Sequence, residues 1–196
     1  MKLTVFYDYI CPFCFLTSKS LEPLSRELGL DIEWKGIEIH PEYPSAGQKS
    51  SRSLKSLKAA EIIKGSAKES GTDIVLPGFR TNSRLSLEAS EFAKTRNRFK
   101  IFHDSVYEAY FMERKNIGDM EIVLETGLKA GLDIAELEEC LVKRTMFSKV
   151  EENKKEAESN LVVGVPTILM GSFPVYGNQS QETLRHMIRR AIERSP

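Results

Sequence analysis

Cysteine is scarce in this sequence. The 196 residues include only three cysteines, Cys11, Cys14 and Cys140. Small secreted domains that depend on disulfides carry cysteines at higher density and in even numbers. A disulfide scaffold is therefore excluded, and a reducing compartment is favoured. Apolar residues make up 41% of the chain, which is enough for a hydrophobic core without cross-links.

Net charge and long apolar runs are also missing. The 28 basic residues balance the 28 acidic ones, so no overall field steers the chain to nucleic acid or to an acidic membrane. No stretch approaches the roughly 18 consecutive apolar residues of a spanning helix. The apolar stretch near the N-terminus is too short for a secretory signal. We therefore expect a cytoplasmic protein with neither nucleic-acid nor membrane partners.

The first forty residues predict a β-α-β unit. Residues 2–8 have the β-rich pattern of a strand. Pro12 suits the first turn of a helix, which should run to about Leu28 and end at Gly29. Residues 31–39 alternate again, with one phase slip at Gly36 that predicts a second strand with a bend.

The end of the chain predicts a β-β-α unit. Residues 167–170 form a short apolar strand, and residues 172–176 are its expected hairpin partner. Pro174 cannot donate to a ladder, so the second of these strands should lie at a sheet edge. Ser180 begins a last amphipathic helix, which continues through Ile192.

Between these units the sequence is helical. Residues 40–53 have the composition of a linker, and the charged run 151–160 is interpreted as a solvated helix face. Caps are expected at Asn82 or Ser83, at Asp119 and at Asp133. Five apolar stripes have helical spacing: Leu54, Leu57, Ala60, Ile63 and Ala67; Leu85, Ala89, Phe92 and Ala93; Phe99, Phe102, Val106 and Tyr110; Ile122, Leu124 and Leu128; Ile134, Leu137 and Leu141.

We therefore expect two parts in an α/β chain. Residues 1–45 and 161–196 form one discontinuous domain, and residues 46–160 form an inserted, all-helical subdomain.

Cys11-Pro12-Phe13-Cys14 is the pattern that carries chemistry. Two cysteines three positions apart at a helix start lie on one turn, close enough to form a disulfide. The partial positive charge of the helix N-terminus stabilises a thiolate at Cys11, and a thiolate is the species that attacks a disulfide. Cys14 lies one turn deeper and is the expected resolving thiol.

A zinc half-site is the rival interpretation of this pattern. It needs two further ligands at matched spacing. The remaining candidate ligands are scattered singly along the chain: Cys140, His40, His103 and His186. We therefore predict no metal site, and a structural role for Cys140.

A second pattern is Gly164-Val165-Pro166-Thr167, an X-Pro bond directly before a short strand. On its own this bond would be expected to be trans, because only about 5–6% of X-Pro bonds in folded proteins are cis.

Three motifs together resemble a known family. They are the segment 7–14 around the two cysteines, Asn82-Ser83 before an aromatic-alanine helix, and the segment 175–179 before the last helix. The chain resembles the DsbA-like thioredoxin superfamily, in particular its FrnE-like branch, which is related to 2-hydroxychromene-2-carboxylate isomerases and kappa-class glutathione transferases. The resemblance implies a thioredoxin fold, β-α-β … β-β-α, with a large helical insertion.

The resemblance also implies roles for individual residues. Pro166 should be cis and lie opposite Cys11, and Val165 should offer its backbone to the substrate next to Thr167. Pro12 and Phe13 tune the two thiols. Further candidates for the cleft are Asn82, Asn178, Gln179, and some of the aromatic residues Tyr107, Tyr110 and Phe111.

Positions at which this chain differs from the related enzymes favour disulfide exchange over the glutathione-dependent reactions. The isomerases and transferases have serine where Cys11 stands, and an Asp-Arg pair where this chain has Gln179-Ser180. Strongly oxidising DsbA proteins have histidine in place of Phe13, so a less extreme redox potential is expected. We predict a thiol-disulfide oxidoreductase or isomerase that acts on protein or small disulfides without a bound cofactor. Its expected reductant is glutathione or thioredoxin.

Two alternatives stay open. One is a glutathione-dependent isomerase or transferase of the 2-hydroxychromene-2-carboxylate isomerase or kappa class. The other is a redox-insensitive module that binds extended peptides along Val165.

Overall fold

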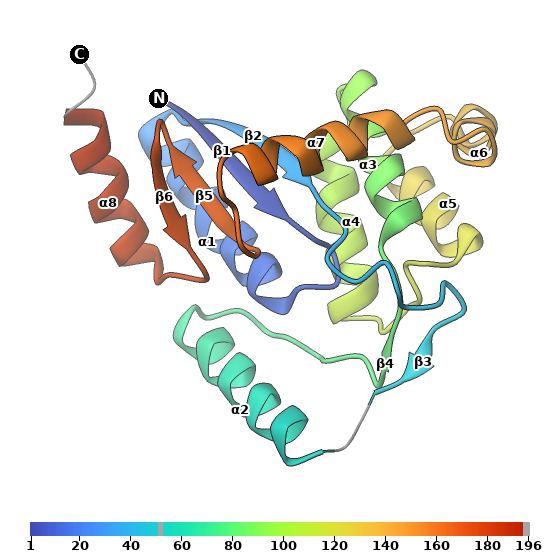
Figure 1. Ribbon diagram of the computed structural model, residues 1–196, viewed down its shortest axis with the longest axis horizontal. Helices are drawn as coiled ribbons and strands as arrows, with labels where there is room; N and C mark the ends of the chain where they lie inside the picture. Colours follow the sequence, from blue (N-terminus) through green and yellow to red (C-terminus); the bar gives the residue numbers. More distant parts are fainter. Residues whose placement is uncertain (51–52, 194–196) are drawn as a thin grey trace.

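A four-stranded sheet is the centre of the computed structural model, which describes residues 1–50 and 53–193. Its strands are β1 (Lys2–Tyr7), β2 (Asp31–Gly36), β5 (Thr167–Met170) and β6 (Phe173–Tyr176), in the order β2-β1-β5-β6 (Figure 1). β2 runs parallel to β1, and β5 and β6 are antiparallel to their neighbours. β6 is therefore an edge strand, as Pro174 predicts.

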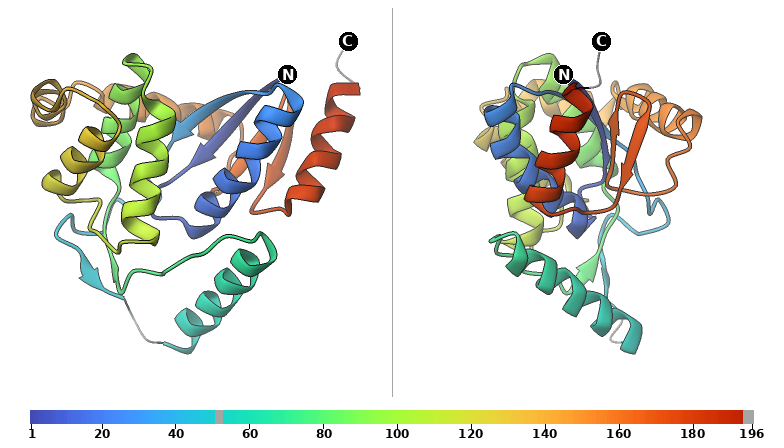
Figure 2. Two further views of the ribbon diagram at one scale, coloured as in Figure 1. Left: turned by 180° about the vertical axis from the view of Figure 1, so that it is seen from behind. Right: turned by 90° about the vertical axis from the view of Figure 1, so that its left-hand side faces the viewer.

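Two helices cover one face of this sheet. They are α1 (Pro12–Leu28) and α8 (Gln181–Glu193), which lie in front of the strands in the left view of Figure 2. Gly29 ends α1 in a left-handed conformation, as predicted. Alternate residues of the strands pack against the two helices in one core cluster, which includes Leu3, Val5, Leu21, Leu24, Ile168, Met170, Leu184 and Ile188.

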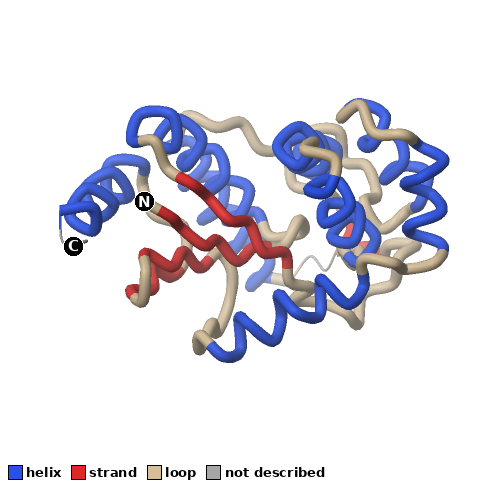
Figure 3. Tube along the Cα trace, turned by 90° about the horizontal axis from the view of Figure 1, so that it is seen from above, coloured by secondary structure: helices blue, strands red, loops and turns tan. Residues whose placement is uncertain are grey.

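A third helix, α7 (Phe147–Ser159), covers the opposite face (Figure 3). Its Ala157 packs with Phe6 and Leu169 of the sheet. The prediction that residues 151–160 form only a solvated face is wrong in part, because Asn153 and Ala157 are buried. Small and amide side chains at this spacing leave a weak hydrophobic signal, although they allow the helix to approach the sheet closely.

Four helices lie beyond the β2 edge of the sheet (Figure 1). They are α3 (Arg84–Thr95), α4 (Phe99–Phe111), α5 (Met120–Lys129) and α6 (Ile134–Val142). Together with residues around Cys11 and Cys14, they form the largest hydrophobic cluster. These elements confirm the predicted α/β class and the helical region between the two β units.

The caps predicted from the sequence mark the starts of α5 and α6, whereas the predicted buried face of α5 is only partly right. The side chains of Asp119 and Asp133 accept hydrogen bonds from backbone N–H groups, as predicted for caps. Ser83 precedes α3 without a side-chain cap bond. In α5 the buried residues include Val123, whereas Leu128 is 66% exposed. Ile122 and Leu124 of the predicted stripe pack against the core, so the prediction is wrong only at Leu128.

Helix α2 (Leu54–Glu69) stands apart from the other helices (Figures 1 and 2). It buries only Ile63 and Ala67, while Leu54 and Leu57 of the predicted stripe are exposed. A short ladder of β3 (Gln48–Lys49) and β4 (Phe79–Arg80) lies close to it. The predicted linker 40–53 thus contains a strand, and its residues 51 and 52 lie outside the described residues.

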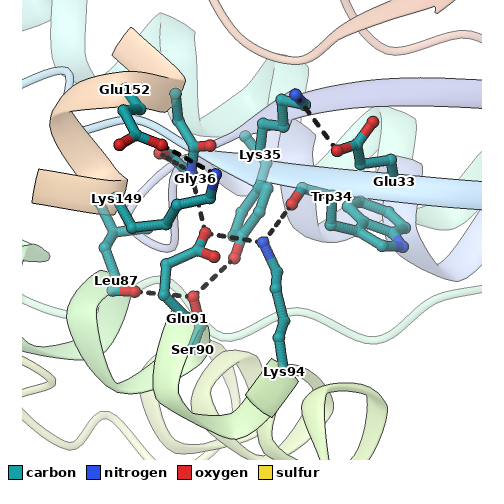
Figure 4. A network of polar contacts seen from close by, with 12 residues as sticks. Glu33, Trp34, Lys35, Gly36, Leu87, Ser90, Glu91, Lys94, Lys149 and Glu152 are labelled. Carbon is teal, nitrogen blue, oxygen red and sulfur yellow. Dashed lines mark hydrogen bonds and ion pairs between the residues drawn. The ribbon is translucent and has the colours of Figure 1, made fainter. Parts of the chain in front are cut away.

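A buried polar network joins α3 and α7 to the end of β2 (Figure 4). Glu91 is 3% exposed and pairs with Lys94 at 2.7 Å. The Lys94 ammonium group also donates to the Trp34 carbonyl at 2.5 Å. The Asn153 amide donates to Glu91 at 2.8 Å and to the Gly36 carbonyl at 3.3 Å. Every charge in this network has a partner, which is the condition for burying it.

Gly36 lies where β2 meets α3. A Cβ atom there would be 2.5 Å from Leu87 Cδ2 and 3.3 Å from the Tyr7 ring. The strand ends at this residue, so the predicted strand 31–39 is too long. Beyond it, the Ile37 N–H still donates to the Tyr7 carbonyl at 2.9 Å.

We predict that Gly36→Ala lowers the free energy of unfolding by about 1–3 kcal/mol, because the added methyl group overpacks a closed contact. Urea unfolding followed by circular dichroism measures this change. Gly65→Ala is the matched control, because Gly65 is exposed within α2 and a Cβ there meets nothing within 4 Å. That control should stabilise α2 by up to about 1 kcal/mol. Equal stabilities of Gly36→Ala and the parent would contradict the close contact.

Candidate active site

Cys11 occupies the N-cap of α1. Its backbone is extended, and Pro12 takes the first helical position. The N–H groups of Cys14 and Phe15 donate to the Cys11 carbonyl at 3.1 and 3.2 Å. The Cys11 sulfur therefore lies at the positive end of the helix dipole.

Cys14 lies deeper, as the spacing predicts. It is 1% exposed, against 7% for Cys11, and both are free thiols. Burial raises the pKa of the Cys14 thiol well above its usual value, and the neighbouring Cys11 sulfur adds to the rise. A thiol in this environment stays protonated until its partner reacts, which suits a second rather than a first nucleophile.

The loop before β5 faces Cys11. The Val165–Pro166 peptide bond is cis, as expected from the resemblance. The Cys11 thiol donates to the Val165 carbonyl at 3.6 Å. Thr167 is fully buried, and its hydroxyl donates to the Gly164 carbonyl at 2.7 Å. The structure thus brings together residues that are 154 positions apart in the sequence.

A buried carboxyl group lies beneath this arrangement and was not found from the sequence. Asp8 is 0% exposed, and its two oxygens accept hydrogen bonds from Ile10 N–H at 3.2 Å and Ile39 N–H at 2.8 Å. Its own carbonyl accepts from Cys11 N–H at 3.2 Å. Burial raises the pKa of Asp8 to about 6, and the two N–H donors offset only part of that effect. The available signal was an acidic residue directly after an apolar strand.

An aromatic cluster packs behind Cys14. Burial lowers the pKa of His103 well below its usual range, and nearby lysines add to the effect, so the ring is neutral. The ring contacts the hydroxyl groups of Ser18 at 3.2 Å and Tyr9 at 3.3 Å. The Tyr107 hydroxyl donates to the Asp8 carbonyl at 3.4 Å. His103 is thus a buried ring in contact with two hydroxyl groups.

An apolar cleft of about 630 Å³ opens beside Cys11. One wall is the start of α1, and α2 lies across from it. Of the aromatic candidates, Tyr110 and Phe111 line the cleft, whereas Tyr107 does not. The wall consists of Ile10, Cys11, Pro12, Ile39, His40, Tyr43, Ser50, Ser56, Leu57, Ala59, Ala60, Ile63, Leu76, Pro77, Phe79, Arg80, Tyr110 and Phe111.

The other candidate residues lie outside that wall. The Asn82 amide donates to the Tyr43 carbonyl at 2.9 Å and so supports the wall from behind. Asn178 accepts a hydrogen bond from the Thr17 hydroxyl at 3.0 Å, and the Gln179 amide donates to the Tyr176 carbonyl at 3.1 Å.

Cys140 lies away from the pair, on α6. It is 5% exposed, and the Thr145 hydroxyl contacts its sulfur at 3.0 Å. Within residues 1–50 and 53–193, no group of three or more His, Cys, Asp or Glu side chains could hold a metal ion. Over the same residues, no helix combines the length and apolar character needed to cross a membrane.

Comparison with known proteins identifies the family. The DSBA-like thioredoxin domain matches residues 2–189, so the chain belongs to the DsbA-like thioredoxin family.

Solved structures share its fold. A probable DsbA oxidoreductase from Streptomyces coelicolor matches with a TM-score of 0.88 and 21% identity, over 100% of this chain and 92% of that one. A 2-hydroxychromene-2-carboxylate isomerase matches with a TM-score of 0.81 and 22% identity, over 99% and 95%. The cytosolic disulfide reductase DsbM from Pseudomonas aeruginosa, in a structure with glutathione, matches with a TM-score of 0.74 and 15% identity, over 98% and 100%.

The buried carboxyl group predicts a specific pH dependence of stability. In the unfolded chain Asp8 loses its proton near its ordinary pKa of 3.8, whereas the folded protein holds it until about pH 6. Below pH 3.8 both states are protonated and Asp8 contributes no pH dependence. Between these values rising pH removes stability, and above pH 6 the loss is complete. At 1.36 kcal/mol per pH unit, it amounts to roughly 3 kcal/mol.

Asp8→Asn should therefore gain roughly 3 kcal/mol relative to the parent between pH 3.5 and pH 7. Urea melts at a series of pH values measure the difference between the two proteins, which cancels the other titrating groups. Asp73→Asn, which replaces an exposed carboxylate, is the control for loss of one charge. If the free energies of unfolding of Asp8→Asn and the parent changed in parallel with pH, Asp8 would have the same pKa in the folded and unfolded states, and the prediction would be wrong.

Proposed function

We propose that this protein is a thiol-disulfide oxidoreductase in which Cys11 attacks and Cys14 resolves. The observation that carries the proposal is the placement of Cys11. Its sulfur lies at the N-cap of α1, lines the cleft and contacts the Val165 carbonyl, while Cys14 is enclosed behind it. The DsbA oxidoreductase and disulfide reductase folds described above support the same reaction class.

The exchange proceeds in two steps. The Cys11 thiolate attacks a disulfide RS–SR′, a bond forms between Cys11 and SR, and R′S⁻ leaves and takes up a proton. Cys14 then loses its proton and attacks the Cys11 sulfur, which releases RS⁻ and closes the Cys11–Cys14 disulfide. Two electrons pass from the dithiol to the substrate. A cellular thiol such as glutathione or thioredoxin restores the dithiol by the reverse exchange, and no bound cofactor takes part.

Glutathione is the partner with the most support, because the similar reductase DsbM has a structure with it. That reductase is cytosolic, and we place this protein in the cytoplasm as well. The substrates in this proposal are protein or small-molecule disulfides, and Val165 supplies the backbone next to which they bind.

The alternative is a glutathione-dependent isomerase, supported by the fold shared with 2-hydroxychromene-2-carboxylate isomerase. Cys11→Ser separates the two functions, because the isomerases resembled here have serine at this position. Insulin reduction with a thiol reductant and isomerisation of 2-hydroxychromene-2-carboxylate are measured on the same preparations. Loss of the first activity in Cys11→Ser supports exchange. Retained isomerase activity without any insulin reduction by the parent would support the alternative.

The order of the two thiols predicts a trapping phenotype. Cys14→Ser should accumulate mixed disulfides at Cys11, because no second thiol releases the substrate. Incubation with a fluorescent peptide disulfide and nonreducing electrophoresis measure the adduct. Cys140→Ser, which removes the cysteine outside the pair, should behave like the parent. A comparable adduct in Cys11→Ser would contradict the assignment.

Reactivity toward alkylation gives an independent prediction. With limiting iodoacetamide at pH 7.5, Cys11 should be labelled before Cys14, because burial raises the pKa of Cys14 and leaves it as a thiol. Mass spectrometry of the digested, reduced protein locates the label. Preferential modification of Cys14 or Cys140 would reverse the proposed roles.

A further inference from the structure

Among the described residues, the wall of the cleft beside Cys11 includes groups that can carry positive charge and no carboxylate. Among its wall residues, His40 and Arg80 are the groups that can carry positive charge, and none of them is Asp or Glu. His40 pairs with the Glu42 carboxylate at 2.8 Å, which compensates any charge on its ring. The ion pairs among residues 1–50 and 53–193 involve other arginines, such as Arg84 with Glu38 and Arg144 with Glu88, but not Arg80. Of the two groups that can carry positive charge in the described wall, Arg80 is therefore the uncompensated one.

Arg80 is held in place without losing its charge. Its Nη1 donates to the Tyr43 hydroxyl at 3.2 Å, and its guanidinium carbon lies 5.8 Å from the centre of the Tyr43 ring. The Tyr43 ring in turn stacks on His40, with centroids 4.5 Å apart and planes at 18°. The stack orders the side chain, while the other guanidinium N–H groups stay available to an anion. A planar, pre-organised guanidinium suits a carboxylate.

Flat apolar surfaces make up much of the remaining wall. Phe79 and Tyr110 meet edge to face, with ring centroids 5.9 Å apart. The ring centroids of Tyr110 and Phe111 are 4.8 Å apart. On α2, Leu57 is 53% exposed and contributes to the wall. A cavity of about 630 Å³ holds a ring-sized group beside the Cys11 sulfur. Aromatic walls favour offset or edge contacts with another ring.

We infer that this cleft selects small disulfides in which an aromatic group carries an acid, with Arg80 binding the anion and the apolar wall binding the ring. The inference rests on the proposed exchange at Cys11 and adds the substrate class. The reaction is the exchange described above: Cys11 forms a mixed disulfide with the arylthiol half, the other half leaves as a thiolate, and Cys14 then releases the first half.

The test uses two disulfides of equal shape. 4,4′-Dithiobis(benzoate) carries two carboxylates, and 4,4′-dithiobis(benzamide) carries none. Each is mixed with the reduced protein, and the rate of Cys11–Cys14 oxidation is measured by acid quenching and mass spectrometry. Dividing each rate by that of the same disulfide with 2-mercaptoethanol removes intrinsic reactivity. The parent should prefer the dibenzoate about three- to fivefold, the effect of one exposed ion pair, and 0.5 M salt should reduce the preference.

Arg80→Gln should abolish this preference and leave the normalised rate with the dibenzamide unchanged. Arg190→Gln removes an exposed arginine of α8, outside the cleft, and should keep the preference. If Arg80→Gln and the parent discriminate equally, the assignment of Arg80 is overturned. If neither protein discriminates although both exchange with the dibenzamide, the substrate class is wrong and the proposed function stands. If the reduced parent is oxidised by neither disulfide nor by insulin, the proposed function itself fails.

A variant on α2 tests the part of the inference that concerns binding of the aromatic ring. Leu57→Gln should lower the preference for the dibenzoate over the aliphatic diacid 3,3′-dithiodipropionate by about threefold, because apolar contact with the ring is lost. Ile62→Gln is the matched control, since Ile62 is 62% exposed on the same helix and does not line the cleft. Equal preferences in the two variants would overturn the role of the α2 wall. Circular dichroism shows whether either variant has lost helix.

Discussion

The Asp8 carboxyl group joins the two chain segments on which the site depends. One oxygen accepts from Ile10 N–H in the loop before α1, and the other accepts from Ile39 N–H in the chain that leaves β2. The backbone carbonyl of the same residue accepts from Cys11 N–H. These bonds orient the loop so that α1 begins directly after Cys11. The raised pKa of Asp8 reflects the cost of burying the carboxylate, which the fold tolerates because both oxygens are bonded.

The parts of the fold that follow from short-range signals could be predicted from the sequence. Pro12 and Gly29 mark the ends of α1, and Asp119 and Asp133 cap their helices, because each acts on backbone groups within a few residues. Pro174 excluded a central position for β6 by removing one donor. The placement of Cys11 and Cys14 belongs to this group as well, since it depends on one turn of one helix.

Features set by distant contacts could not be predicted from the sequence. The buried face of α7 depends on Asn153, whose partners Gly36 and Glu91 come from other elements. The apolar stripe of α2 suggested a buried helix, yet the stripe partly lines a cleft. That cleft combines the loop after β2, α2, β4 and the end of α4, so no single segment carries its pattern. The proposed role of Arg80 depends on the contacts of His40 and Arg80 with the Tyr43 ring, which only the structure shows.

Reaction and selection therefore depend on different parts of the chain. In the proposed exchange, the start of α1 supplies the reacting sulfur and the Val165 loop lies next to it, whereas α2 and the β3–β4 ladder supply most of the facing wall. Cys11 is only 7% exposed, so in the proposed exchange a disulfide has to bind in the cleft before the Cys11 sulfur can attack it. Because α2 buries only Ile63 and Ala67, few apolar contacts oppose its displacement. In the proposed selection, α2 mainly sets the size of an acceptable substrate, and Arg80 sets its charge.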